Sequence, residues 1–245
     1  MAILDILDQI SKKGADIGAI ADRLIKNSRQ IPAVVKALQT EKSAKKFAYE
    51  KTLRLISERA PGLVYPFFDV FVELLDSDNS FLKWGAIISV ANLTVVDSQN
   101  RFETVFRKYY APICGPTMVT AANIIGGSSV IARAKPDLVD SITNELLKVE
   151  KAKFLTKGMP SPECRNVAIG QAIDSFDEFY NLIGLKTKVM GFVRRQLKNT
   201  RIQVVRKAER FIKKHGMLEE ASSKRKSAAK PRRSGSGFSH KQKTV

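Results

Sequence analysis

The sequence contains few of the residue types from which catalytic and metal sites are built. Its 245 residues include two cysteines, two histidines and one tryptophan. The cysteines, Cys114 and Cys164, form no CxxC pair, and the histidines are His215 and His240. Neither a disulfide scaffold nor an all-protein zinc site is therefore expected. Walker, dinucleotide-binding, HExxH and GxSxG motifs are also absent. We expect no catalytic, cofactor-binding or metal-binding residues and no enzyme activity.

The sequence also lacks a long, uninterrupted apolar run. The longest stretch without a charged residue, 109–132, has 24 residues, but prolines and glycines interrupt it. We interpret it as buried helical pieces with their turns rather than as a membrane span. The first residues have no basic region and carry Asp5 and Asp8, which favours an amphipathic helix over a signal peptide. An intracellular, cytoplasmic protein without membrane association is expected.

Positive charge is concentrated at the C-terminal end. Residues 186–245 contain 19 of the 42 lysines and arginines but only 3 of the 24 acidic residues, so they carry +16 of the net charge of +18. The last 30 residues are rich in Ser, Gly and Lys and poor in residues that pack into a core, which is typical of a disordered tail. We expect the last helix to end near Gly216, because a Lys-Lys-His turn precedes that glycine.

Before the tail, helical periodicity is almost continuous, and no strand-like alternation competes with it. Turn signals such as Pro61-Gly62 divide this region into helices, and we interpret Gly126-Gly127 as a helix stop. The helices pair into five hairpins, which are 29–39 with 42–59, 62–75 with 80–95, 101–111 with 116–126, 137–153 with 162–179, and 187–198 with 201–214.

The second helices of these hairpins are alike, because each places a small residue where one helix must approach another closely. These residues are Ala48, Ala86, Ala121, Ala168 and Ala208, at spacings of 38, 35, 47 and 40 residues. A two-helix unit repeated about every 40 residues is typical of an α-solenoid, in which no unit buries its apolar face alone. Over about residues 29–214 the chain resembles the HEAT/armadillo repeat superfamily.

The resemblance implies an all-α fold, an α-solenoid of about five HEAT-like helical hairpins; the alternative is a non-repetitive helical bundle. We expect residues 1–215 to form the helical repeat domain, with 1–27 as its N-terminal cap, and 216–245 to form the disordered basic tail. The function implied is a non-catalytic scaffold that mediates macromolecular interactions.

The last hairpin is expected to have a basic outer face. Val189, Val193 and Leu197 are predicted to point inward, which leaves the cations outside. Like charges such as Arg206 and Arg210 repel at i,i+4 spacing, so an anionic partner is a natural counterweight; a merely solvated face is the alternative. The candidate partner-binding residues are Arg194, Arg195, Lys198, Arg206, Lys207, Arg210, Lys213 and Lys214 on this face and Lys224, Arg225, Lys226, Lys230, Arg232 and Arg233 in the tail.

We expect a protein partner, with the basic end contacting an acidic one. The alternative is a DNA- or RNA-binding protein with weak sequence preference, since few aromatics accompany the charges. HEAT-like DNA glycosylases are a less favoured alternative: they use tryptophans and a carboxylate, and their catalytic residues cannot be matched here. Trp84 stands in a strongly apolar context, which favours core packing. The tail cations resemble a short nuclear-localisation signal, so a nuclear location is a further option in a eukaryote.

Overall fold

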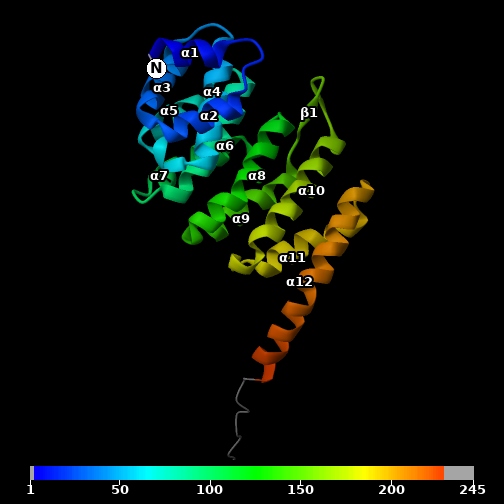
Figure 1. The fold of residues 1–245 in the computed structure, drawn as a ribbon. Coiled ribbons are helices and arrows are strands. Elements are labelled where there is room, and N and C mark those ends of the chain that lie inside the picture. Colours follow the sequence, from blue (N-terminus) through cyan, green and yellow to red (C-terminus); the bar gives the residue numbers. More distant parts are fainter. Residues whose placement is uncertain (1–2, 229–245) are drawn as a thin grey trace, which may run out of the picture.

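The structure, a computed structural model, describes residues 3–228, with side chains described for 6–216. Helices dominate this part of the chain (Figure 1). The α-helices are α1 (Ile3–Ser11), α2 (Ile17–Lys26), α3 (Ile31–Thr40), α4 (Lys45–Arg59), α5 (Phe68–Leu74), α6 (Ser80–Leu93), α7 (Arg101–Tyr110), α8 (Met118–Ala134), α9 (Val139–Leu147), α10 (Pro162–Phe179), α11 (Lys186–Arg195) and α12 (Ile202–Ala228).

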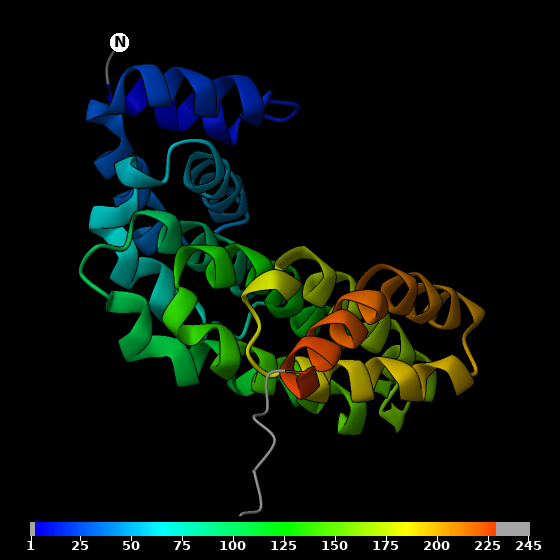
Figure 2. The same cartoon turned by 90° about the horizontal axis from the view of Figure 1, so that it is seen from below.

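The helices form successive hairpins, α3/α4, α5/α6, α7/α8, α9/α10 and α11/α12, which confirms the predicted all-α solenoid. Their second helices pack on one another in chain order to form a row, the second-helix row, which consists of α4, α6, α8, α10 and α12; α2 packs against its first member. Figures 1 and 2 show this stacking from the blue N-terminal helices to the orange α12 at the opposite end.

The small-residue register is confirmed at four of the five positions. Ala86, Ala121, Ala168 and Ala208 are fully buried, whereas Ala48 is half-buried near the start of α4. A methyl group in place of a longer side chain lets neighbouring second helices approach closely. The repeat pattern in the sequence therefore reflects the packing of the second-helix row.

The predicted helix stop at Gly126-Gly127 is wrong, because α8 continues through both glycines to Ala134. Gly127 serves close packing instead. A Cβ atom built there would lie 2.6 Å from the Tyr109 hydroxyl oxygen and 2.8 Å from the Ala91 Cβ. These distances are shorter than van der Waals contact, so α8 requires a residue without a side chain at this point of its packing against α6 and α7.

The last hairpin also differs from the predicted inward face. Val189 and Val193 are buried as expected, but Leu197 is 42% exposed and Gln196 is buried in its place. The reason is that α11 ends at Arg195 and a 3₁₀ turn, Gln196–Lys198, follows. A 3₁₀ turn has three residues per turn, so it shifts the phase of the inward positions.

Two further departures concern loops and the C-terminal end. A two-residue strand β1 (Leu155–Thr156) pairs antiparallel with β2 (Met159–Pro160) between α9 and α10, where only turn residues were expected. The last helix does not end at Gly216 but reaches Ala228. The predicted tail thus overlaps α12, and its remaining residues, 229–245, lie outside the described part of the chain.

Candidate binding surfaces

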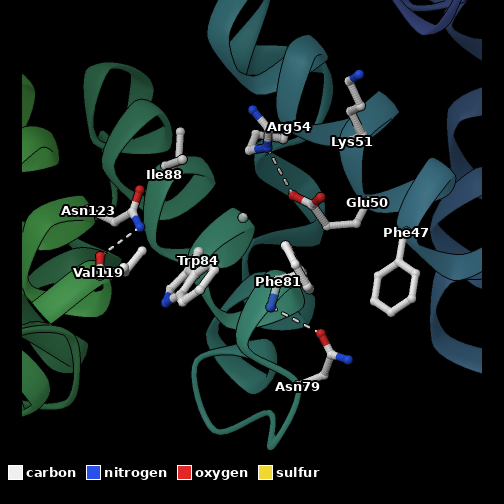
Figure 3. Close-up of a pocket in the computed structure, with 11 residues that line it drawn as sticks. Phe47, Glu50, Lys51, Arg54, Asn79, Phe81, Trp84, Ile88, Val119 and Asn123 are labelled. Carbon is white, nitrogen blue, oxygen red and sulfur yellow. Dashed lines mark hydrogen bonds and ion pairs between the residues drawn. The ribbon is translucent and has the colours of Figure 1, made fainter. Parts of the chain in front are cut away.

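An open groove of about 750 Å³ crosses the second-helix row at α4, α6 and α8 (Figure 3). We call it the aromatic groove. Its walls are mainly apolar, and two cations, one carboxylate and two amides complete them. The lining residues are Phe47, Glu50, Lys51, Arg54, Asn79, Phe81, Trp84, Gly85, Ile88, Val119 and Asn123.

Helical spacing brings these side chains to one face. Phe81, Trp84 and Ile88 follow one another at three- and four-residue steps on α6, so they share a side of that helix. The start of α6 is fixed by Asn79, whose side-chain oxygen accepts hydrogen bonds from the backbone N–H of Phe81 at 3.0 Å and of Leu82 at 3.3 Å. This N-cap holds the first turn, and with it Phe81, in place.

The aromatic rings form a connected and partly exposed cluster. Phe81 packs edge-on against Phe47 and Trp84, with ring centroids 6.2 and 5.5 Å apart. The Trp84 indole N–H donates a hydrogen bond to the Thr120 hydroxyl at 2.9 Å, which ties α6 to α8. Phe81 is nevertheless 68% exposed and Val119 40% exposed. Trp84, expected in the core, is half-buried: it packs against the core and also lines the groove.

A buried ion pair forms one side of the groove. Arg54 donates from Nε to Glu50 Oε1 at 3.2 Å, and Glu50 is only 7% exposed. Burial raises the pKa of the Glu50 carboxyl to about 7, although the charge and hydrogen bond of Arg54 and the charge of Lys51 oppose this shift. Gly85 makes the arrangement possible, since a Cβ there would lie 1.8 Å from Glu50 Oε1. The lining of the groove therefore carries more positive than negative charge.

The candidate residues of the basic face are exposed, except that Lys207 is half-buried. Three of them form ion pairs with carboxylates of the preceding repeat. Arg195 donates from Nε and Nη2 to the two carboxylate oxygens of Glu150 at 2.9 and 2.7 Å. Lys207 pairs with Asp174, and Lys214 with Asp177. These three cations attach the last hairpin to the repeat before it.

The remaining five cations of this face have no ion-pair partner within the described part of the chain. We call them the open cations, and they are Arg194, Lys198, Arg206, Arg210 and Lys213. They come from α11, the turn that follows it, and α12. Of the tail candidates, Lys224, Arg225 and Lys226 fall within α12 but their side chains are not described, and Lys230, Arg232 and Arg233 lie outside the described residues.

Sequence reasoning missed the contacts of Asp177 and His215. The His215 ring is 4% exposed, stacks on Tyr180 and Phe211 at centroid distances of 4.1 and 4.6 Å, and places Nε2 2.5 Å from Asp177 Oδ1. Burial by itself would raise the pKa of Asp177, but hydrogen bonds from Lys214 and His215 outweigh it and lower that pKa. Asp174 and Asp177 of α10 thus fasten α12 to α10.

The described residues contain no cluster of three or more His, Cys, Asp or Glu side chains that could hold a metal ion. Cys114 is exposed as a residue, but its thiol is partly shielded from solvent, and this desolvation raises the pKa of the thiol. Hydrogen bonds with Ser161 and Thr156 lower the pKa of Cys164, but no histidine contact is found at its sulfur in the described structure. In the same part of the chain, every helix is too short or too polar to cross a membrane.

The sequence signal for the aromatic groove was present but ambiguous. Helix α6 is apolar on nearly all sides, which predicts a buried helix. The structure buries Leu82, Ala86 and Ile87 and leaves Phe81 exposed. The sequence does not show which apolar side chains of α6 the neighbouring helices will cover. Phe81 can be recognised as part of a candidate binding surface only when the positions of those helices are known.

The chain is similar in fold to designed armadillo repeat proteins. One of these, solved in complex with the peptide (KR)4, has 12% sequence identity and a TM-score of 0.52, with 86% of this chain and 90% of that chain covered. A second design has 12% identity and a TM-score of 0.50, with 86% of this chain and 99% of that one covered. No protein-family model matches the sequence, and the comparison with curated proteins gives no match. The shared architecture is that of an armadillo/HEAT-like α-solenoid.

Proposed function

We propose that this protein is a non-catalytic scaffold that binds an extended segment of a protein partner in the aromatic groove. The observation that carries the proposal is the cluster of exposed Phe81 and Val119 with half-buried Trp84, on the successive second helices α6 and α8, lining a groove of about 750 Å³. Clustered exposed apolar side chains often mark interaction sites, and cavities of roughly 300–1,000 Å³ accommodate ligands. The fold adds support, since one designed armadillo protein is in complex with a peptide.

We further propose that the basic C-terminal end contacts an acidic partner through the open cations. The three paired cations already attach the last hairpin to the preceding repeat, so they are poorly placed to bind a second anion. The open cations have no such role, and an added negative charge would relieve their mutual repulsion. The sequence alone did not distinguish these two groups.

Nucleic acid is the second candidate partner for the same end. The observation that favours it is the density of open cations over two neighbouring elements, α11 and α12, with more lysines and arginines following in the sequence. A phosphate backbone matches such a surface without reading bases. Exposed aromatic side chains that could stack on bases do not accompany the open cations in the described region.

The groove is tested by selecting a displayed peptide library against the full chain. We expect the selected peptides to lose binding to Phe81→Ser and to keep it with Ile202→Ser. Ile202 is a matched control, because it is similarly exposed, at 61%, but lies on α12 away from the groove. Peptides that bind both variants equally well, or a selection that yields none, would overturn the proposal.

The basic end is tested by titrating the full chain with a poly-Glu peptide and with duplex DNA at several salt concentrations. The variant replaces Arg194, Arg206, Arg210 and Lys213 with Gln, and a control of equal charge replaces Lys12, Lys13, Lys42 and Arg107 with Gln. If DNA is the partner, the slope of log K against log salt should become shallower by about 3 to 4 in the variant but not in the control. Loss of poly-Glu binding alone favours an acidic protein. Equal behaviour of the two variants would contradict both candidates.

We also propose that the protein has no enzyme activity and that it is located inside the cell, in the cytoplasm or the nucleus. Neither candidate surface combines a nucleophile with a general base, which acyl or phosphoryl transfer would need. A nuclear location is supported by the basic sequence at 224–233 in a eukaryotic host.

A further inference from the structure

Several walls of the aromatic groove are held in place by contacts within the protein itself. The hydrogen bond from Trp84 to Thr120 fixes the indole ring, and the Asn79 cap holds the first turn of α6, which carries Phe81. Gly85 and Glu50 pack α6 against α4 at a distance that no larger residue would allow. Preorganised walls reduce the entropy lost on binding, so an apolar anchor gains most of its burial energy.

The charged residues beside the apolar walls determine which residues of a bound peptide are favoured next to its apolar side chain. Lys51 is exposed at the edge of the groove and Arg54 is half-buried within it. The single carboxylate in the lining, Glu50, is already paired with Arg54. One cation therefore remains unmatched when Glu50 is ionised, and two when Glu50 is protonated. A carboxylate that arrives beside the anchor finds a partner in either state.

We propose that the groove binds an extended peptide segment in which a bulky apolar residue is flanked by Asp or Glu. The apolar side chain lies against Phe81, Trp84 and Val119, and the acidic side chain pairs with Lys51 or Arg54. This inference rests on the proposed function, since it names the chemistry of the segment that the scaffold binds. It also makes the groove and the basic C-terminal end selective for the same kind of acidic partner.

The protonation of Glu50 gives this binding a characteristic pH dependence. Among the described residues, the charged groups that act on Glu50 are Arg54 and Lys51, both on its own helix. The α6 and α8 sides of the groove contribute Gly85, Asn79, Val119 and Asn123, none of which titrates in this range. An acidic peptide repels ionised Glu50 and so favours its protonated form. Its affinity should therefore fall as pH rises through about 7.

The experiment compares three labelled peptides that share a central Leu-Phe pair and carry Glu, Gln or Lys on both sides. Fluorescence anisotropy is measured with the full chain between about pH 6 and pH 8, where Glu and Lys side chains of the peptides keep their charge. We expect the Glu peptide to bind about tenfold more tightly than the Gln peptide, and the Lys peptide to bind most weakly.

The variants assign this preference to the groove. Phe81→Ser should abolish binding, Ile202→Ser should leave it unchanged, Lys51→Gln should reduce the advantage of the Glu peptide, and Glu50→Gln should remove the pH dependence. Circular dichroism of each variant verifies the fold. Phe81 and Lys51 are exposed, so their substitution should leave the helices intact.

The other outcomes are decisive in different ways. The proposed acidic preference is wrong if the Lys peptide binds most tightly or if the Glu and Gln peptides bind equally well. If Phe81→Ser still weakens binding in that case, the groove remains a peptide-binding site. Binding that rises with pH for the Glu peptide would also overturn the acidic preference. If no peptide binds, or if Phe81→Ser has no effect, the proposed function falls with the inference.

Discussion

Two joints of the second-helix row, α6–α8 and α10–α12, are held together in different ways. Between α6 and α8 the contact depends on small residues: Gly127 lies against Ala91, and a hydrogen bond joins Trp84 to Thr120. Between α10 and α12 charged groups add to the apolar packing, with Lys207 on Asp174 and both Lys214 and His215 on Asp177. One solenoid thus uses close packing at one joint and ion pairs at another.

This difference explains what each end leaves available to a partner. At α4–α8 the groove left open is lined mainly by apolar side chains, with Glu50, Lys51 and Arg54 at one side. At the C-terminal end the carboxylates of α10 and of the turn after α9 are engaged by cations, so the surface left open is positively charged. In each region, the side chains that do not take part in the contact between helices remain exposed and determine which kind of partner can bind there.

The two ends should also respond to pH in opposite directions. The pKa of Glu50 is raised by burial, so the stability it contributes is present at low pH and lost as pH rises through about 7. The pKa of Asp177 is lowered by its two partners, against the effect of burial, so its contribution is lost as pH falls below the ordinary range of a carboxyl group.

The largest effect is expected from Glu50→Gln, which removes the ionisable group at the groove end. A pKa of about 7 against 4.5 corresponds to a free-energy penalty of about 3 kcal/mol for the ionised carboxylate. The variant should therefore gain up to that amount over the natural chain near pH 8 and little near pH 4. Urea unfolding followed by circular dichroism measures the difference, and identical pH profiles would contradict the assignment.

A smaller effect is expected from Gly127→Ala at the packed joint. The added methyl group would overlap with Tyr109 and Ala91, which should lower the free energy of unfolding by about 1–3 kcal/mol, independently of salt. Gly126→Ala is the matched control, because no atom lies within 4 Å of its Cβ position. It should raise stability by about 0.4–1 kcal/mol. The same sign for both neighbours would show that the α6–α8 joint is looser than described.

The smallest effect is expected from Asp177→Ala at the charged joint. Asp177 is partly exposed, so we expect a loss of only about 1 kcal/mol at neutral pH. This loss should shrink in high salt and vanish at acidic pH, where the natural carboxyl is also neutral. Thermal unfolding of Glu73→Ala, which removes an exposed carboxylate with no ion pair in the described structure, provides the baseline. A salt-independent loss would mean that packing, not charge, holds α12.

Much of the fold could be predicted because helical periodicity and small residues are local signals. The buried alanines follow from a repeat of about 40 residues, whereas the role of Gly127 depends on Tyr109 and Ala91, which belong to other helices. A glycine pair in a sequence fits a helix stop as well as it fits close packing, and only the neighbours distinguish these cases.

The candidate surfaces were predictable to a smaller extent. The excess of cations in the last hairpin was evident from the sequence, but their division into paired and open groups depends on Glu150, Asp174 and Asp177 in the preceding repeat. The aromatic groove was not predicted, because the exposure of Phe81 results from how three helices pack together. Ion pairs between repeats depend on the tertiary structure, so they cannot be predicted by counting charged residues in the sequence.

The contacts between repeats join residues that are close in sequence, and this bears on synthesis at the ribosome. Trp84 and Thr120 are 36 residues apart, and Lys207 and Asp174 are 33 apart. Such short separations favour rapid, sequential folding of a nascent chain from its N-terminal end. The last helix that lines the aromatic groove ends at Ala134. A growing chain can therefore complete this groove, and engage a partner there, before the ribosome has translated the basic C-terminal end.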